Sequence, residues 1–141
     1  MTDIEALQRT LAAEHAAAFV FGALGGRASS LAAPQLQDDV TSAYDVHLER
    51  RDQLRTMITA AGADPVAAEP AYRLPSPLDT AEQIAAEALR VQRACVTTYA
   101  ALVAAGDRGD RRWALEAMTR TALTEADFGG RPQPLPGLHR G

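Results

Sequence analysis

A glutamate at position 14 is the residue of this sequence with the clearest potential for chemistry. It interrupts an apolar stripe that recurs at helical spacing, made of Ile4, Leu7, Leu11, Ala18, Phe21 and Gly25. Burial of an unpaired carboxylate is unfavourable by on the order of several kcal/mol. We therefore expect Glu14 to have a hydrogen-bonding partner, to bind a metal ion, or to be held in its protonated form.

The second predicted helix offers partners for Glu14 on one of its faces. Three- and four-residue spacing there places polar side chains among apolar ones, in the series Val40, Tyr44, His47, Arg51, Leu54 and Ile58. One interpretation is a buried polar cluster of Glu14, Tyr44, His47 and Arg51 that fixes the register of the helices. The other is an acid–base site in a pocket, because a carboxylate beside an imidazole is a common catalytic pair.

A dinuclear iron or manganese site is the third possibility for this glutamate. Such a site takes one Glu from each of two helices and a Glu-x-x-His motif from each of the other two. Tyr44 stands three residues before His47, where the motif needs a carboxylate, and the last predicted helix contains no histidine. We therefore expect no metal cofactor; if iron or manganese binds, the available ligands are Glu14, His47, Glu87 and Glu116.

The composition predicts that helices alone position these residues. Apolar residues make up 47% of the 141 residues and aromatic residues only 5%, and alanine recurs throughout. Because alanine is the best helix former and lets helices approach closely, the sequence predicts an all-α fold. The predicted helices cover residues 3–25, 31–61, 79–105 and 108–128 of a bundle spanning 1–130, and a Pro-rich tail follows at 131–141.

Capping residues and glycines define the expected helix ends. Thr2 with Glu5, and Asp79 with Glu82, have the spacing of capping boxes. Asp107 or Asp110 is expected to open the last helix. Pairs of glycines at 25–26 and 129–130, and the single glycine at 62, predict the helix C-termini.

The connections between the predicted helices indicate the topology. Short links join the first helix to the second and the third to the fourth, so each pair should form an antiparallel hairpin. Residues 63–78 form a longer linker with four prolines, which reaches about 53 Å when extended. It can carry the chain back along the whole bundle. One long crossover between two hairpins is the ferritin-like arrangement of four helices.

Charge and hydropathy exclude several classes of partner. The net charge is -4 and the arginines are scattered, which argues against a nucleic-acid-binding surface. The sequence has no apolar run of 18 residues and no basic-then-apolar start, so we expect neither a membrane helix nor a signal peptide. A single cysteine, Cys95, suits a reducing compartment. These features predict a cytoplasmic protein.

Four segments together resemble a known family: LAAEHAAAFVFGALG, HLERRDQL, AEPAYRLPSP and PLPGL. They are similar to the ferritin-like domain of unknown function found in alanine-rich conserved proteins of actinobacteria, and the resemblance covers nearly the whole chain. It implies a four-helix fold and a homodimer, but no activity. The ferritin-like superfamily binds metal through the motif that this chain lacks, so ferroxidase, storage and oxygenase roles are not expected.

Two functions remain open from the sequence. The first is a metal-free, non-catalytic bundle that acts through protein or small-ligand contacts, as a homodimer. The second is a small enzyme that uses Glu14 and His47 as metal-binding or acid–base groups in a bundle pocket, with Arg51 orienting an anionic substrate. A solvent-open pocket beside Glu14 would favour the enzyme, and a closed core would favour the structural role.

Overall fold

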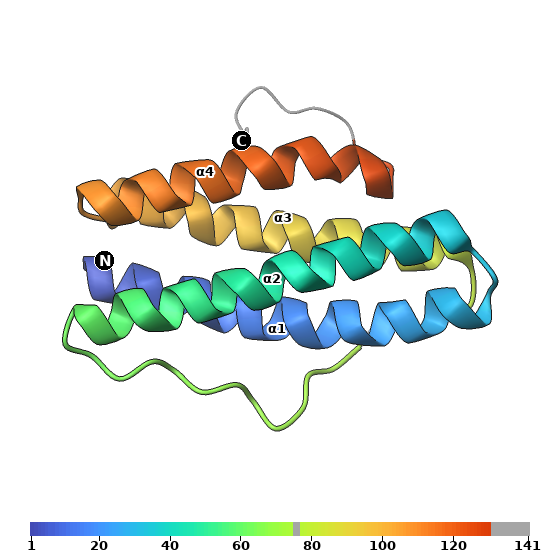
Figure 1. Ribbon diagram of the computed structural model, residues 1–141, viewed down its shortest axis with the longest axis horizontal. Helices are drawn as coiled ribbons and strands as arrows, with labels where there is room; N and C mark the ends of the chain where they lie inside the picture. Colours follow the sequence, from blue (N-terminus) through green and yellow to red (C-terminus); the bar gives the residue numbers. More distant parts are fainter. Residues whose placement is uncertain (75–76, 131–141) are drawn as a thin grey trace.

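The protein is an all-α bundle of four helices (Figure 1). The computed structural model describes residues 1–74 and 77–130, and this part of the chain contains no strand. The helices are α1 (Asp3–Ser30), α2 (Pro34–Ala60), α3 (Ala81–Ala105) and α4 (Arg108–Thr124), and a short 3₁₀ helix, η1 (Glu125–Phe128), follows α4. The Pro-rich tail predicted at 131–141 lies outside the described residues.

The first helix begins as predicted but ends later. Thr2 and Glu5 form the expected capping box, in which each side chain accepts a hydrogen bond from the other residue's backbone N–H. The helix then continues through the glycines at 25–26 as far as Ser30. Leu24 and Ala28 are both fully buried, four residues apart on one face. Their burial offsets the cost of two helical glycines, about 1 kcal/mol each, so the helix does not stop there.

The other helix ends follow the same local chemistry, with small shifts. Pro34 opens α2, where its missing N–H is not needed, and Gly62 with φ +87° follows the end of that helix. The capping box of α3 is formed by Thr80 and Gln83, one residue beyond the predicted pair. Asp107 caps α4 by accepting a hydrogen bond from the N–H of Asp110.

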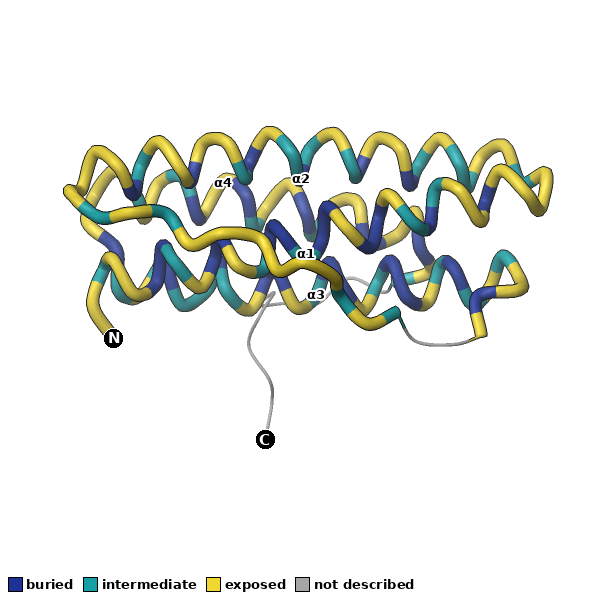
Figure 2. The backbone as a smooth tube through the Cα atoms, turned by 90° about the horizontal axis from the view of Figure 1, so that it is seen from below, coloured by how far each residue is buried: buried dark blue, intermediate teal, exposed yellow. Residues whose placement is uncertain are grey.

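Residues 61–74 form a strap that runs along the outside of the bundle (Figures 1 and 2). The side chain of Gln8 donates to the carbonyl of Asp64 and accepts from the N–H of Val66. Further along α1, His15 donates to the Val66 carbonyl at 3.0 Å, and the Phe19 ring packs against Tyr72 at 5.4 Å. The strap therefore follows α1 from its beginning towards its end.

This crossover fixes the direction of each helix. Helices α1 and α2 form one antiparallel hairpin, α3 and α4 form the other, and α3 runs parallel to α2 (Figure 1). The predicted arrangement of two hairpins joined by a long crossover is confirmed. No helix among the described residues is long and apolar enough to span a membrane.

The helices do not pack equally closely against one another. Backbone contacts are extensive between α1 and α2, between α1 and α3, and between α3 and α4. Helices α2 and α4 instead meet mainly through long side chains, such as the Trp113 indole N–H that donates to Gln53 at 2.7 Å. The space between α2 and α4 is where the bundle opens to solvent.

Candidate functional site

The site is centred on Glu14, which is completely buried in the middle of α1. One of its carboxylate oxygens accepts a hydrogen bond from Nδ1 of His47 on α2, at 2.5 Å. The other accepts a hydrogen bond from the hydroxyl of Tyr99 on α3. The His47 ring also stacks on Phe21, with centroids 5.2 Å apart and planes at 20°. Each oxygen of Glu14 thus has a partner from a different helix.

Tyr99 connects the carboxylate to a buried arginine. Its hydroxyl donates to Glu14 and accepts from Nη1 of Arg50 at 2.9 Å. Arg50, only 6% exposed, also donates to the hydroxyl of Thr121 at 2.7 Å and to the carbonyl of Ala117 at 3.4 Å, both on α4. Helices α1 to α4 therefore all contribute to one hydrogen-bonded chain, in the order His47, Glu14, Tyr99, Arg50 and Thr121, which we call the relay.

The charges of the relay explain its titration behaviour. Burial, followed by the negative charge of Glu14, raises the pKa of Tyr99 well above its ordinary value, so this phenol stays protonated. The same two causes raise the pKa of the Cys95 thiol, which lies beside Glu14 on α3. Tyr99 can therefore donate to Glu14 at all physiological pH values while it accepts from the guanidinium of Arg50.

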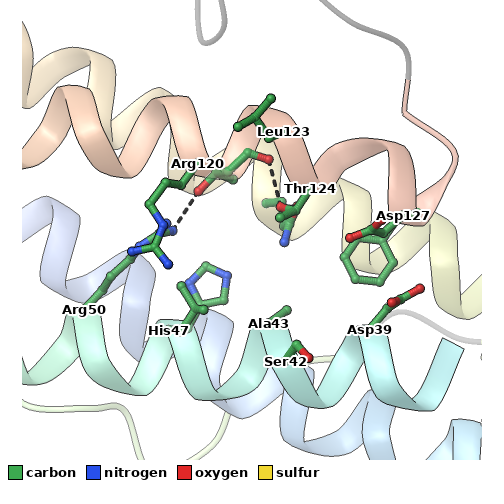
Figure 3. Close-up of a pocket in the computed structure, with 13 residues that line it drawn as sticks. Asp39, Ser42, Ala43, His47, Arg50, Arg120, Leu123, Thr124 and Asp127 are labelled. Atoms are coloured by element: carbon green, nitrogen blue, oxygen red, sulfur yellow. Dashed lines mark hydrogen bonds between the residues drawn. The ribbon is translucent and has the colours of Figure 1, made fainter. Parts of the chain in front are cut away.

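His47 and Arg50 form part of the wall of an open cleft between α2 and α4 (Figure 3). The cleft has a volume of about 360 Å³, within the usual range for small-molecule sites. The rest of its lining comes from α2, α3, α4 and η1. His47 is only 1% exposed, yet its ring lies between the two helices and borders this space. Glu14 itself does not line this space, and His47 lies between the buried carboxylate and the cleft.

The structure brings together two of the four residues predicted for the polar cluster. Glu14 and His47 are in direct contact, whereas Arg51 is half-exposed and pairs with its neighbour Asp52 at 3.1 Å. The buried cation is Arg50, so the prediction of Arg51 was wrong by one position, which turns a side chain about 100° around a helix. Tyr44 lies near Gly22 on α1, and no hydrogen bond joins it to Glu14.

Sequence reasoning also missed Tyr99 and Thr121. Tyr99 stands four residues after Cys95, on the same helix face. That spacing was the available signal for Tyr99. Nothing in the local sequence distinguishes Thr121 from the exposed threonine at 119, because their difference depends on which side of α4 faces α2.

The four metal ligands considered from the sequence do not form a set. Glu87 pairs with Arg90 at 2.5 Å, and Glu116 is exposed on α4. Within the described residues, the buried group with ligand atoms within 4.8 Å of one another is Glu14, His47 and Cys95. A dinuclear centre needs several bridging carboxylates and two imidazoles, whereas this group offers one of each and a thiol. The residues therefore do not fit the dinuclear site of ferritin-like proteins.

Comparison with known sequences places the chain in a family. The profile described as "Domain of unknown function (DUF4439)" matches residues 6–140. The chain belongs to the DUF4439 family. The resemblance to a domain of unknown function is thus confirmed at the level of the family.

A solved structure resembles this DUF4439 protein along most of its length. It is the crystal structure of a conserved hypothetical protein, Rv2844, from Mycobacterium tuberculosis. The two are 30% identical, with a TM-score of 0.81, and the match covers 90% of this chain and 94% of the mycobacterial one. No curated protein matches the DUF4439 chain.

Proposed function

We propose that the cleft between α2 and α4 is the active site of a small enzyme in which His47 acts as a general base. The observation that supports this is the position of His47 between a buried carboxylate and an open cleft. Its Nδ1 donates to Glu14, and its ring borders a space of about 360 Å³. The ferritin-like arrangement of two hairpins around one crossover supports a ferritin-like ancestry without its metal chemistry.

The hydrogen bond to Glu14 determines the tautomer of the imidazole. Because a carboxylate accepts, Nδ1 carries the proton and Nε2 presents its lone pair. Within the described residues, Nε2 of His47 has no hydrogen-bonding partner. It is not one of the fully buried polar atoms that lack a partner, so some of its surface is accessible. This geometry supports a role for Nε2 in taking a proton from water or from a ligand hydroxyl in the cleft.

The rest of the relay supports the same role through charge. Arg50 and Glu14 carry opposite charges and are linked through the Tyr99 hydroxyl. They balance each other, so His47 is not required as a permanent cation to neutralise the carboxylate. When Nε2 takes up a proton, Glu14 is already positioned to stabilise the imidazolium, as the acidic member of a catalytic triad does.

Hydrolysis of an activated ester tests this proposal directly. With p-nitrophenyl acetate, His47→Ala should lower the rate by about tenfold or more, because the positioned base is lost. His15→Ala is the matched control, since His15 contacts the strap on another side of the bundle and should leave the rate unchanged. Equal rates in the wild type and His47→Ala, with native circular dichroism in both, would overturn the proposal.

Glu14→Gln separates the carboxylate from the imidazole. The amide preserves the size of the side chain but cannot stabilise an imidazolium by charge, so ester hydrolysis should fall while the bundle stays folded. Nitrogen-15 NMR of the His47 ring should show the Nδ1-protonated tautomer in the wild type. A ring that is protonated on Nε2 instead would contradict the proposed base.

Self-association is the second candidate function, and exposed leucines on α4 favour it. Leu123 is 76% exposed and Leu115 is 44% exposed, two helical turns apart. We propose that a homodimer would cover them. Sedimentation equilibrium of the wild type and Leu123→Asp tests this idea, because a dimer through α4 should dissociate in the variant. A wild-type monomer at high micromolar concentration would remove this candidate.

A further inference from the structure

The charged groups around the cleft are separated by sign along its length. Arg50 and Arg120 lie at one end, and Asp39 and Asp127 lie at the other (Figure 3). Each end has one of these residues on α2 and one on α4 or η1. The sign of the charge therefore changes in the same direction along both walls of the cleft. His47 lies between the two ends.

These four charges are not satisfied by one another. Among the described residues none of them forms an ion pair, although the same structure pairs Arg51 with Asp52 and Arg90 with Glu87. Arg50 uses its guanidinium on the Tyr99 and Thr121 hydroxyls and the Ala117 carbonyl, none of which is an anion. The charge of Arg50 is balanced by Glu14 through Tyr99, so the positive charge available to a ligand is that of Arg120 at one end, and the negative charge is that of Asp39 and Asp127 at the other.

Helix geometry gives the distance between the positively and the negatively charged end of the cleft. Arg120 and Asp127 are seven residues apart on consecutive helical segments, and Asp39 and Arg50 are eleven apart on α2. At 1.5 Å per residue these separations are roughly 10 Å and 16 Å along the helix axes. The lining also includes the apolar side chains of Ala43, Leu123 and Phe128.

We propose that the cleft binds an elongated amphoteric molecule, with a carboxylate towards Arg120 and an ammonium group towards Asp39 and Asp127. This inference rests on the proposed function and adds the class of substrate to it. A short peptide with free termini has this form, since three extended residues span roughly 10 Å. Its central, uncharged part would lie against the apolar lining, beside His47.

Trialanine with free termini is a suitable probe, and its blocked forms are the matched controls. In ¹⁵N-edited NMR titrations, the free peptide should shift the backbone amides of residues 39–50 and 120–127. Acetylation of the amino terminus and amidation of the carboxyl terminus should each weaken binding about threefold to fivefold, the usual effect of one partly exposed ion pair. Equal affinity of the free and the doubly blocked peptide, or shifts confined to another surface, would overturn the inference.

Two charge variants assign the ends of the peptide. In Asp127→Asn the effect of acetylation should shrink, and in Arg120→Gln the effect of amidation should shrink, while the other effect persists. Asp38→Asn and Arg112→Gln change the same charges on exposed positions outside the cleft and should leave both effects intact. If the ends respond to the wrong variants, the proposed orientation is wrong.

Failure of this inference can be distinguished from failure of the proposed function. If no peptide binds but ester hydrolysis still depends on His47, the base is supported and the amphoteric ligand is rejected. If peptides bind with the expected charge dependence but hydrolysis ignores His47, the ligand class is supported and the general base is rejected.

Discussion

The contact between α1 and α3 and the gap between α2 and α4 show two ways of pairing helices within one bundle. On the closed side, small buried residues such as Ala17 and Ala88 belong to the core, and the Cys95 thiol lies 3.8 Å from the carbonyl of Ala13. On the open side, Arg50 and Gln53 bridge to α4 through hydrogen bonds. Small side chains let backbones approach, whereas long polar ones hold them apart and leave room for a ligand.

The largest effect on the free energy of unfolding is expected from a substitution on the open side, at Arg50. Arg50→Met should lower the free energy of unfolding by about 3–5 kcal/mol, because Glu14 then stays buried without its balancing cation. Arg51→Met is the matched control at the next position, where the ion pair with Asp52 is largely exposed. It should change stability by less than about 1 kcal/mol. Urea unfolding of both variants measures the difference, and equal losses would contradict the role given to Arg50.

The second largest effect is expected when an alanine is replaced by leucine on each side of the bundle and the losses of stability are compared. Ala88→Leu adds a large side chain to the closed core and should destabilise the fold by about 1–3 kcal/mol. Ala43 is also buried, but it borders the cleft, so part of the added side chain can enter open space and Ala43→Leu should destabilise the fold less than Ala88→Leu does. Thermal unfolding of the two variants compares them. A larger loss for Ala43→Leu would show that the cleft is not open in solution.

The smallest expected effect is a pH dependence of stability at Asp110, which lies at one end of the bundle. Burial, followed by hydrogen bonding to Asp3, raises the pKa of Asp110 to about 7. In the unfolded chain this carboxyl has its ordinary pKa near 3.8, so the folded state binds the proton more tightly between these values. Its contribution to stability is present below about pH 4 and is lost as pH rises through 7.

Asp110→Asn should remove this pH dependence. Relative to the variant, the wild type should lose about 1–2 °C in melting temperature between pH 5 and pH 8, a small shift because solvent screens this half-buried group. Asp79→Asn is the control: Asp79 is exposed, lies just before α3, and its replacement should leave the pH dependence of the wild type unchanged. A wild-type melting temperature that rises over this range relative to Asp110→Asn would show that the sign is wrong.

Local signals made the helices and their topology predictable from the sequence. The capping box at Thr2 and the proline-rich segment at 63–78 each depend on residues a few positions apart, or on chain length alone. The end of α1 was less predictable, because it depends on Ala28 finding space in the core. Burial against other helices outweighed the local preference of two glycines to end the helix.

The candidate site was predictable only in part, for a geometric reason. Glu14 and His47 stood out because each is polar on an apolar stripe. Arg50 is adjacent to Arg51, the position that the stripe of the second helix indicated, and a shift of one residue rotates a side chain by about 100°. The rotation of a helix about its own axis is set by its neighbours, so the pattern within one helix does not determine it.

The relay has a consequence for how this family can change over generations. Because Glu14, Arg50, Tyr99 and Thr121 come from four different helices and complete one another's hydrogen bonds, replacing one of them leaves a buried group without its partner. We expect these four positions to vary together across the family, either all retained or all exchanged for apolar residues. Lineages that lost the relay as a unit should also have lost the histidine at position 47.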